Sequence, residues 1–587
     1  MVRVSAGGFR WWIAAEHRDT LLGPRGLRLE EWLQSGQARI VKKGPHRVVY
    51  RVDLPGLCFY VKRNLVTDRW CRIRRLFRPS KARMEYQRAR GVAQRGFPTY
   101  LPLAFGEQKI WAGPGESILI THALEDTQEL HTFAVNSLAH LPAPRQARLR
   151  QRMAIELGKL VARLHDAGIK HNDLHPANIL VRLTEDDQLA LFLIDLTAVR
   201  LGMPLTWRQS RQNLVILNRW FVLRASRSDR YRFWKAYRLE RQQGKGCAPL
   251  SSREGLDRAD EVEIHTLASN LKFWKRRDKR CLRNNRYYCR VASAGVVGHA
   301  VVDLDAKLRN TLLADPDEPF RRSGVKFLKD SHTSTVIELD AVIDGQPRTM
   351  IYKRFQTSSW KDPWTRLFRP PPALRSWIQG QGFRERGLPT ARPLAVLHRQ
   401  RNGLLHEGYL LTEKIENAQD LHEFLANLGQ RSTACKLPIL RGQIAQVATV
   451  LRELHRRRLS HRDLKAANIL VSRDSSSFFS PFSNMAWTTS SPSLLPIFAT
   501  SVWLIDLVGV RRYRWLSRSR KIQNLARMNA SFQTGTALTL TDRLRFLRTY
   551  LRWSLHGKAD WKGLWKAINL ATQEKINRNH KRGRPLE

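Results

Sequence analysis

The alternation of hydrophobic and polar residues along this 587-residue chain predicts two β-hairpins in similar surroundings, one in each half. Apolar side chains recur at every second position on both sides of a turn, which is typical of paired strands with one buried face. The segments are 47–52 and 58–62 around Leu54-Pro55-Gly56, and 335–339 and 349–353 around Asp344-Gly345-Gln346.

Helical spacing follows each hairpin. A charged helix is predicted directly after it, then a strand ending at Thr121 or Thr412, and then a long helix with a continuous apolar face. The four predicted helices cover 80–94, 146–167, 373–386 and 440–457. A small β-rich lobe followed by a larger helical lobe is therefore expected twice, which is an α+β fold.

A ten-residue motif also occurs twice, directly after the long helices. Residues 171–180 read His-Asn-Asp-Leu-His-Pro-Ala-Asn-Ile-Leu, and residues 461–470 read His-Arg-Asp-Leu-Lys-Ala-Ala-Asn-Ile-Leu. In both copies an Asp precedes an Asn by five positions. A further Asp closes a later apolar run, at Asp195 and Asp506.

The two halves keep their register over a long stretch. Lys62 and Lys353 lie 291 residues apart, and so do Gly96 and Gly387 within two Gly-x-Pro-Thr elements. A chance match would not hold over this distance, so a whole domain is repeated. The predicted boundaries are 35–245 for the first domain, 246–319 for a basic linker with some helix, and 320–575 for the second domain, which carries a Ser-rich insertion at 475–501.

These residue types at these spacings are what phosphoryl transfer requires. Asp173 and Asp463 are the candidates for orienting an acceptor hydroxyl. The candidate magnesium ligands are Asn178, Asp195, Asn468 and Asp506, and the candidate ligands of the nucleotide phosphates are Lys62 and Lys353. One Asp-x-x-x-x-Asn pair is also compatible with an ordinary capped turn, but two copies with a preceding His and a later Asp favour the catalytic interpretation.

A phosphate-binding Lys needs a carboxylate on the following helix to orient it. Glu85 is that candidate in the first domain. The matching position in the second domain is Ser376, so the partner of Lys353 is missing there. Glu385 lies nine residues further along and would need a shifted helix to replace it. The first domain is therefore expected to be competent, and the second to bind nucleotide but transfer poorly.

The chain carries 102 Lys and Arg against 51 Asp and Glu, a formal charge of +51. Basic residues gather with aromatic ones in 69–83, 272–290 and 511–521, which favours contact with an anionic surface. No signal peptide and no spanning helix are expected, since Pro496 and Asp506 interrupt the most apolar stretch. The six cysteines show no metal-ligand spacing and are interpreted as reduced thiols.

Each half resembles the lipopolysaccharide core kinases of the Kdo/WaaP family, a bacterial branch of the protein-kinase-like fold. The elements that carry the resemblance are 60–62, 95–104, 171–180 and 193–196 in the first half, and 352–353, 386–395, 461–470, 504–507 and 542–547 in the second. The resemblance implies ATP and magnesium as cofactors. It also implies a sugar hydroxyl of lipopolysaccharide, or of a related lipid-linked saccharide, as acceptor at the cytoplasmic face of the inner membrane.

Two alternatives remain at this point. The acceptor is either such a saccharide or a protein hydroxyl, and one or both domains are either enzymes or pseudokinases that recruit partners. Nucleic acid is not expected as a partner. The complete set in the first domain (Lys62, Glu85, Asp173, Asn178 and Asp195) favours an enzyme.

Overall fold

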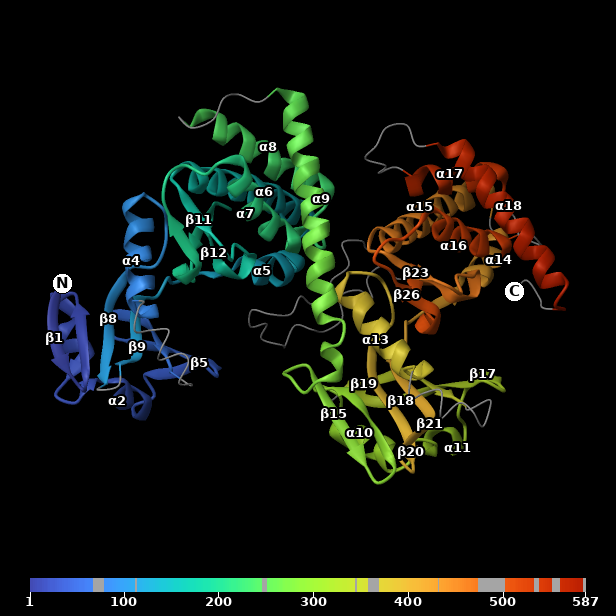
Figure 1. Ribbon diagram of the computed structural model, residues 1–587, viewed down its shortest axis with the longest axis horizontal. Coiled ribbons are helices and arrows are strands. Elements are labelled where there is room, and N and C mark those ends of the chain that lie inside the picture. Colours follow the sequence, from blue (N-terminus) through green and yellow to red (C-terminus); the bar gives the residue numbers. More distant parts are fainter. Residues whose placement is uncertain are drawn as a thin grey trace. The chain divides into compact units, whose positions relative to one another are not determined.

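The computed structural model describes residues 1–66, 79–110, 113–244, 251–343, 346–356, 369–430, 432–472, 502–532, 538–551 and 560–583. These residues divide into two compact units, Met1–Ser269 and the part that begins at Asn270 (Figure 1). The boundary between the units falls inside one helix, α9 (Ser252–Arg277). Each unit has a β-rich lobe followed by a helical lobe, so the expected α+β fold is confirmed.

The β-rich lobe of the first unit is a seven-stranded antiparallel sheet of order β1-β2-β8-β9-β7-β6-β5. Its strands are β1 (Val2–Ala6), β2 (Phe9–Ile13), β5 (Ala38–Gly44), β6 (Arg47–Leu54), β7 (Leu57–Asn64), β8 (Pro102–Ile110) and β9 (Gly113–His122). The predicted hairpin is confirmed as β6 and β7, with Val49 opposite Lys62. Alternation fixes its register, because Phe59 and Val61 are fully buried while Lys62 points to the other face.

The sheet of the second unit has the same order, β15-β16-β20-β21-β19-β18-β17. Its strands are β15 (Tyr288–Ser293), β16 (Val296–Val301), β17 (Phe327–Ser331), β18 (Ser334–Ile343), β19 (Gln346–Phe355), β20 (Pro393–Arg401) and β21 (Leu404–Glu413). The second predicted hairpin is confirmed as β18 and β19, with Val336 opposite Lys353. Its expected turn residues, Asp344 and Gly345, lie outside the described residues.

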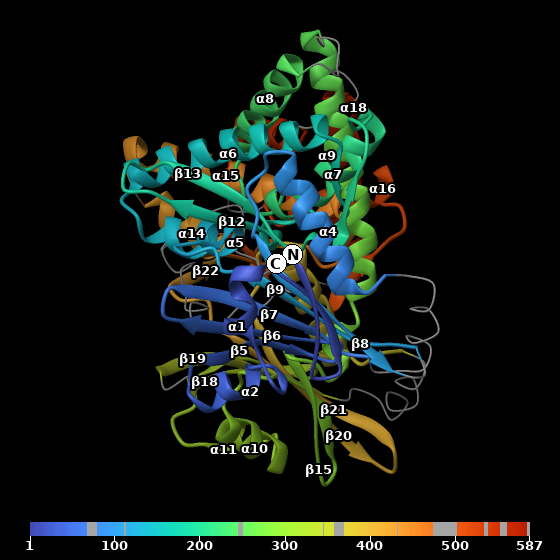
Figure 2. The same cartoon turned by 90° about the vertical axis from the view of Figure 1, so that its left-hand side faces the viewer.

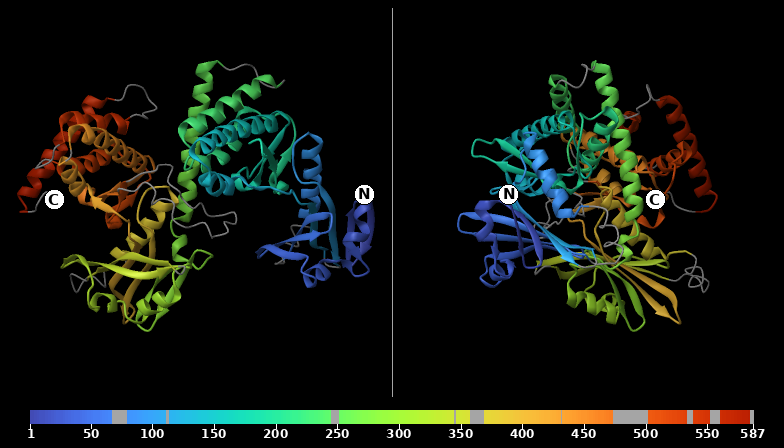
Figure 3. Two further views of the ribbon diagram at one scale, coloured as in Figure 1. Left: turned by 180° about the vertical axis from the view of Figure 1, so that it is seen from behind. Right: turned by 60° about the vertical axis from the view of Figure 1, so that its left-hand side comes forward.

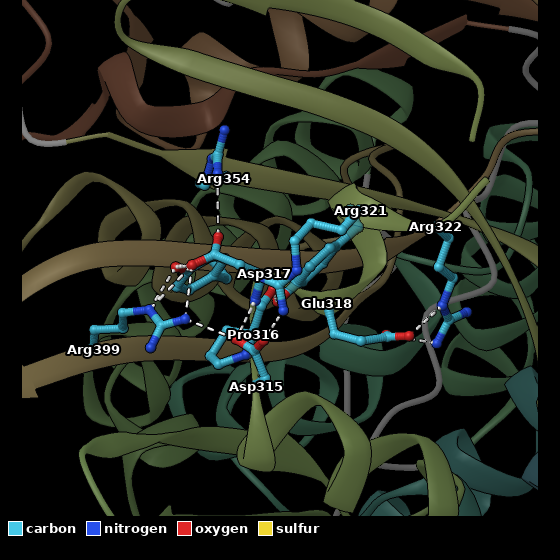
Figure 4. Close-up of polar contacts among 10 residues, drawn as sticks. Asp315, Pro316, Asp317, Glu318, Arg321, Arg322, Arg354 and Arg399 are labelled. Atoms are coloured by element: carbon cyan, nitrogen blue, oxygen red, sulfur yellow. Dashed lines mark hydrogen bonds and ion pairs between the residues drawn. The ribbon is translucent and has the colours of Figure 1, made fainter. Parts of the chain in front are cut away.

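Part of the segment expected to be a linker, 246–319, belongs to the fold of the second unit. Strands β15 and β16 join its sheet, and α10 (Ala306–Ala314) and α11 (Glu318–Arg321) follow them. Asp317, just before α11, accepts hydrogen bonds from Arg399 Nη2 at 2.8 Å, Arg354 Nη1 at 3.2 Å and the Tyr409 hydroxyl at 2.9 Å (Figure 4). These contacts fix the segment to β19, β20 and β21.

The predicted helices are confirmed in both units. The helix after the Lys strand is α4 (Lys81–Gln94) or α13 (Pro372–Glu385), and the long helix is α6 (Ala143–Asp166) or α15 (Thr433–Arg456). Leu157, Leu160 and Val161 of α6 lie in the core of the first helical lobe. Figures 2 and 3 show the helical lobe of each unit on one side of its sheet.

Short strands and further helices complete each helical lobe. In the first unit they are β10 (Gln128–Glu129), α5 (Leu130–Thr132), β11 (Ile169–His171), β12 (Ile179–Leu183), β13 (Leu189–Leu193), β14 (Val199–Leu201), α7 (Trp207–Phe221), α8 (Arg227–Gln243) and α9. In the second they are β22 (Ala418–Asp420), α14 (Leu421–Gly429), β23 (Leu459–His461), β24 (Ile469–Ser472), β25 (Val502–Leu504), β26 (Val510–Arg512), α16 (Arg518–Ala530), α17 (Leu540–Leu551) and α18 (Trp561–His580).

The repeated motifs occupy equivalent places in the two units. Residues 171–180 run from the end of β11 into β12, and 461–470 run from the end of β23 into β24. Asp195 follows β13, and Asp506 follows β25. The Ser-rich insertion expected at 475–501 lies outside the described residues.

Candidate active site

Lys62 lies on β7 with its ammonium group held by a buried carboxylate. The Nζ atom is 2.6 Å from Oε1 of Glu85, whose side chain is 1% exposed. Glu85 also accepts a hydrogen bond of 2.6 Å from the Tyr100 hydroxyl, and the Lys62 ammonium stands 4.5 Å from the centre of the Tyr100 ring. The pairing of Lys62 with Glu85 expected from the sequence is therefore present in the structure.

Tyr100 is the residue of this cluster that the sequence did not indicate. Burial raises the pKa of its hydroxyl well above the ordinary value, and the charge of Glu85 raises it further. The hydroxyl therefore stays protonated and donates to the carboxylate. A buried carboxylate is costly unless charge and hydrogen bonds compensate it, and Lys62 and Tyr100 supply both.

The loop after β11 holds the first candidate catalytic residue, Asp173, in an exposed position. Asn178 Nδ2 donates to the backbone carbonyl of Asp173 at 2.9 Å, which ties the two motif residues together. His175 Nε2 lies 3.5 Å from the Asp173 carboxylate. The hydrogen bond from His175 lowers the pKa of Asp173 below its usual value and outweighs the opposing effect of burial, so the carboxylate stays ionised.

His171 supports this loop from within the core. Its ring Nε2 lies 3.3 Å from the carbonyl oxygen of Ile194, and its backbone N–H donates to Asn213 Oδ1 at 3.1 Å. Burial lowers the pKa of His171, which favours the neutral ring. The ring Nδ1 also accepts a hydrogen bond of 3.2 Å from the backbone N–H of Asp173, so both ring nitrogens are engaged. A neutral ring fixed in this way agrees with a structural role for the motif histidine and lies directly beside the segment that leads to Asp195.

Asp195 has the left-handed backbone conformation, with φ 52° and ψ 57°. This strained conformation is uncommon for a residue other than glycine and turns the chain sharply after β13. Its Oδ1 accepts a hydrogen bond of 2.8 Å from Thr197 and lies 3.6 Å from Arg47 Nη1. Burial raises the pKa of Asp195, but the charges of Arg47 and Lys62 outweigh burial and hold the pKa below the ordinary value.

Two sets of hydrogen bonds position the segment that precedes Asp195. Ile194 N–H donates to the Asn178 carbonyl at 3.0 Å, which brings the two candidate metal ligands together. On the other side, Leu193 N–H donates to the Pro98 carbonyl at 3.0 Å, and the Thr99 hydroxyl donates to the Leu193 carbonyl at 2.7 Å. The Gly-x-Pro-Thr element therefore fixes β13 from the opposite side.

The second unit repeats the hydrogen bonds around the candidate metal ligands. Asn468 Nδ2 donates to the Asp463 carbonyl at 2.8 Å, and Ile505 N–H donates to the Asn468 carbonyl at 3.1 Å. Asp506 has φ 53°, matching Asp195. The Thr390 hydroxyl donates to the Leu504 carbonyl at 2.8 Å, as Thr99 does to Leu193.

The lysine side differs between the units. Ser376 stands five residues after the N-cap of α13, as Glu85 does after the N-cap of α4, and its side chain is buried. Without a carboxylate there, Lys353 Nζ lies 3.2 Å from Asp506 Oδ1. Glu385 does not replace Glu85, because its carboxylate is buried 3.5 Å from Arg277.

Three further residues that contact Glu85 or Asp195 in the first unit are replaced by a different residue type in the second unit. The pairing of the strands and the shared Gly-x-Pro-Thr register identify the matching positions. Arg47 corresponds to Ser334, Tyr100 to Ala391, and Thr197 to Val508. Besides the carboxylate of Glu85, the second unit therefore lacks the hydroxyl that donates to Glu85 and the two side chains that contact Asp195 in the first unit.

The side chains near Asp195 suit a hard cation. Because Asn178 Nδ2 is engaged by the Asp173 carbonyl, its amide oxygen is the atom left for a ligand, and the Asp195 carboxylate supplies a second oxygen. Carboxylate and amide oxygens are the ligands that Mg²⁺ prefers beside nucleotide phosphates. Among the described residues no three His, Cys, Asp or Glu side chains gather in the manner of a zinc site.

The comparisons with known proteins agree with this geometry. A family model described as the lipopolysaccharide kinase (Kdo/WaaP) family matches residues 31–237 and 330–483, together more than half of the chain. A 3-deoxy-D-manno-octulosonic acid kinase of Haemophilus influenzae is 37% identical over 92 residues, which cover 16% of this chain and 34% of that protein. The enzyme of the same name from Mannheimia succiniciproducens is 28% identical over 143 residues, covering 24% of this chain and 54% of that protein.

The chain thus spans between a third and just over half of the length of these relatives. A solved structure titled "WaaP in complex with acyl carrier protein" aligns with a TM-score of 0.32 and 21% identity, over 44% of this chain and 99% of that one. The family model matches both halves of the chain, each of which carries the Asp-x-x-x-x-Asn motif. The chain belongs to the lipopolysaccharide kinase (Kdo/WaaP) family.

Proposed function

We propose that this protein is an ATP-dependent phosphotransferase that phosphorylates a sugar hydroxyl of the lipopolysaccharide core or of a related lipid-linked saccharide. The observation that carries the proposal is the joint placement of Lys62 with Glu85, and of Asn178 beside the left-handed Asp195. Phosphoryl transfer depends on positioning and charge stabilisation, and these pairs supply a fixed cation and a fixed set of oxygen ligands.

Each residue of the first unit has a defined task in this proposal. Lys62, oriented by Glu85, binds the nucleotide phosphates, while Asn178 and Asp195 hold the Mg²⁺ that neutralises phosphate charge when bound. Asp173 lies exposed near the start of the loop that leads to Asn178, and it accepts a hydrogen bond from the acceptor hydroxyl, orienting it toward the transferred group. Its lowered pKa keeps it an acceptor at neutral pH.

The turn between β5 and β6 is connected to this site through Arg47. Arg47 begins β6, and its guanidinium group reaches Asp195. A cation next to this turn is placed to contact nucleotide phosphates. In the second unit the matching turn carries hydroxyl groups, and Ser331 Oγ donates to the Ser334 carbonyl at 2.9 Å.

For the second unit we propose nucleotide binding with slow transfer. Asp463, Asn468 and Asp506 keep the arrangement of the first unit, so the metal side is intact. Lys353 contacts Asp506 and has no carboxylate on α13 to direct it toward the phosphates. A pseudokinase role for this unit is the alternative, and it predicts no transfer even when the missing carboxylate is restored.

The saccharide acceptor is favoured over a protein hydroxyl by the relatives, which are named as kinases of 3-deoxy-D-manno-octulosonic acid. The decisive experiment follows ATP consumption by the purified chain with a lipopolysaccharide extract and with a generic protein substrate in parallel. Phosphate incorporated into the saccharide and absent from the protein is the expected result. Incorporation into protein alone would assign the alternative function.

We also propose peripheral attachment to an anionic membrane surface, through the basic segment 511–521. Trp515 in this segment is 76% exposed, and Arg458 lies 5.0 Å from the centre of its ring. An exposed indole surrounded by arginines suits the headgroup region of an anionic bilayer. Within the described residues, no helix is both long and apolar enough to cross a membrane.

The other two basic segments contribute differently to this surface. The segment 69–83 lies outside the described residues except for its last five. In 272–290, Trp274 is 2% exposed, and Arg386 and Arg457 lie over its ring at 5.6 and 5.9 Å. Part of the segment 272–290 is therefore buried in the second unit. The proposal of membrane attachment rests on the segment 511–521.

A further inference from the structure

One face of α16 in the second unit is directed at the loop that holds Asp463. Asn524 Oδ1 accepts a hydrogen bond of 2.9 Å from the backbone N–H of His461, and Ser531 Oγ accepts one of 3.3 Å from Ala466 N–H. Arg527 stands between them, three residues after Asn524 and four before Ser531. Residues at this spacing share one helix face, so the half-buried side chain of Arg527 faces the same loop.

Helix α18 adds two more cations to this place. The helix packs against α16, and Asn529 Nδ2 donates to the buried Thr572 hydroxyl at 3.1 Å. Lys575 and Arg578 follow Thr572 at three-residue spacing along α18. Lys575 Nζ donates to Asn579 Oδ1 at 2.8 Å, which keeps the ammonium group on this side of the helix.

The positive charges affect one another. Burial lowers the pKa of Arg527, and the charges of Arg462 and Arg578 lower it further. The pKa of Lys575 is also lowered, first by burial and then by Arg527 and Arg578. The carboxylate that acts on both cations is Asp463, the candidate catalytic residue, and within the described residues neither Arg527 nor Lys575 forms an ion pair with an acidic side chain.

The matching positions in the first half lack two of these three cations, although the surrounding contacts are repeated; the third, Arg578, corresponds to Lys272. Asn213 Oδ1 accepts from His171 N–H, as Asn524 does from His461, so Arg527 corresponds to Ile216. Asn218 Nδ2 donates to Thr266 at 3.1 Å, as Asn529 does to Thr572, so Lys575 corresponds to Ser269. The cations are therefore not required to pack these helices.

Repulsion between half-buried cations is unfavourable unless an anion compensates it. An anion held by Arg527, Lys575 and Arg578 would sit next to Asp463, on the acceptor side of the site. Guanidinium and ammonium groups bind phosphate and carboxylate through charge-assisted hydrogen bonds.

We propose that the second unit takes a saccharide that already carries an oxyanion group, bound by Arg527, Lys575 and Arg578, whereas the first unit takes an acceptor without an anion at that position. The proposal rests on the phosphotransferase function given above and divides the two units by acceptor. The proposal gives a reason why Asp463 is retained although the second unit lacks counterparts of Glu85 and Tyr100. The unit binds a charged saccharide even when transfer is slow.

Calorimetric titration of the full-length chain tests this, with a non-hydrolysable ATP analogue and Mg²⁺ in excess to fill the nucleotide sites. The probes are glucose 6-phosphate, glucuronate, inorganic phosphate and glucose. The test variant is Arg527→Ile with Lys575→Ser, which introduces the residues of the first unit. Arg527→Lys with Lys575→Arg keeps the charges, and Arg401→Gln removes an exposed arginine at the far end of β20.

We expect glucose 6-phosphate or glucuronate to bind the wild-type chain, and the test variant to bind it at least about tenfold more weakly. The charge-conserving and Arg401 variants should match the wild type, and glucose should not compete. Whichever of the two sugar anions binds more tightly identifies the anionic group of the saccharide as a phosphate or a carboxylate. Equal affinity in the test variant and the wild type would overturn the proposal, as would failure of both sugar anions to bind the wild-type chain.

If inorganic phosphate binds as tightly as glucose 6-phosphate and competes with it, the sugar adds no affinity. This result would overturn the saccharide part of the proposal and indicate a site for free phosphate. Because these titrations measure binding without transfer, they separate this proposal from the proposed function. A chain that consumes no ATP but loses sugar-anion binding in the test variant would contradict the phosphotransferase assignment and support the cluster.

Discussion

The ammonium group of Lys353 lies 3.2 Å from the carboxylate of Asp506, the residue whose counterpart Asp195 is a candidate metal ligand. In the first unit the equivalent Lys62 is drawn away toward Glu85, 2.6 Å from it. One missing carboxylate on a helix therefore changes which group the lysine contacts. If Asp506 holds Mg²⁺ as proposed, the ammonium group of Lys353 would have to leave this oxygen atom when the metal binds.

The Glu85→Gln variant should lower turnover by about two orders of magnitude, because small misplacements of a positioning group cost about this much. The fold should persist, since glutamine fits the same space and still accepts from Tyr100. Steady-state kinetics on the saccharide acceptor would measure the loss. Glu116→Gln is the matched control, because it removes a carboxylate paired with Arg63 on the same sheet, and it should keep wild-type turnover.

Asp173→Ala combined with Asp463→Ala should abolish measurable transfer while leaving thermal unfolding unchanged within about 1 kcal/mol, since both carboxylates are exposed on loops. Asp173→Ala alone should remove most activity, and Asp463→Ala alone should remove little. Single-turnover measurements on all three variants would compare the two units. Full activity in the double variant would contradict the assignment of both aspartates.

Ser376→Glu should raise transfer by the second unit, measured in the full-length chain carrying Asp173→Ala. The new carboxylate lies at the helix position of Glu85 and competes with Asp506 for Lys353. Adding Ala391→Tyr should raise it further, because it supplies the hydroxyl that stabilises Glu85 in the first unit. Ser376→Gln is the uncharged control, and an equal gain with glutamine would rule out the ion pair as the cause.

High salt should release the protein from vesicles that contain anionic phospholipid, because such attraction is screened over about 8 Å at physiological ionic strength. Trp515→Ala should weaken binding at every salt concentration, since it removes an exposed indole from the basic segment. Sedimentation with vesicles measures both. Retention after a salt wash, with release only by detergent, would show a stronger anchor than the one proposed.

The stability of each helical lobe should fall as the pH is lowered from about 6.5, the ordinary pKa of histidine, toward about 3. His165 and His455 are buried, the Nδ1 atom of each shares a hydrogen bond with a tyrosine hydroxyl, and burial lowers the pKa of each to about 3. In this window the unfolded chain binds a proton that the folded chain excludes, so each histidine costs up to about 1.4 kcal/mol per pH unit.

Denaturant titrations at two pH values inside this window would measure the slope. Replacing both residues by phenylalanine should flatten it, although the variant is less stable overall because Tyr237 and Tyr550 lose a partner. An unchanged slope in the double variant would assign the acid sensitivity to other groups.

The sequence predicted the elements that depend on local periodicity. The hairpins around Val49 and Val336 and the helices α4, α6, α13 and α15 follow from alternation and helical spacing. Strands β1, β2, β15 and β16 did not emerge from the repeat, because Phe9–Ile13 and Val296–Val301 share almost no residues. A sheet pairs through its backbone, so quite different side chains can occupy equivalent strands.

The same distinction applies to the site. The acidic residues and the lysines were predicted because they lie in motifs whose spacing is local. Tyr100 and Arg47 were not, because their contacts to Glu85 and Asp195 depend on how distant segments meet. The only local indication for Tyr100 was that it directly follows the Gly-x-Pro-Thr element. That this element ends beside α4 becomes visible only in the fold.

Hydrogen bonds hold β13 from both sides. Leu193 is bonded to Pro98 and Thr99 on one side, and Ile194 to Asn178 on the other, just before Asp195. The two candidate oxygen ligands, Asn178 and Asp195, are therefore held together by backbone hydrogen bonds, and β25 is attached in the same way in the second unit. The two units have therefore kept the hydrogen bonds that hold these strands and diverged in the side chains that contact the lysine and the aspartate.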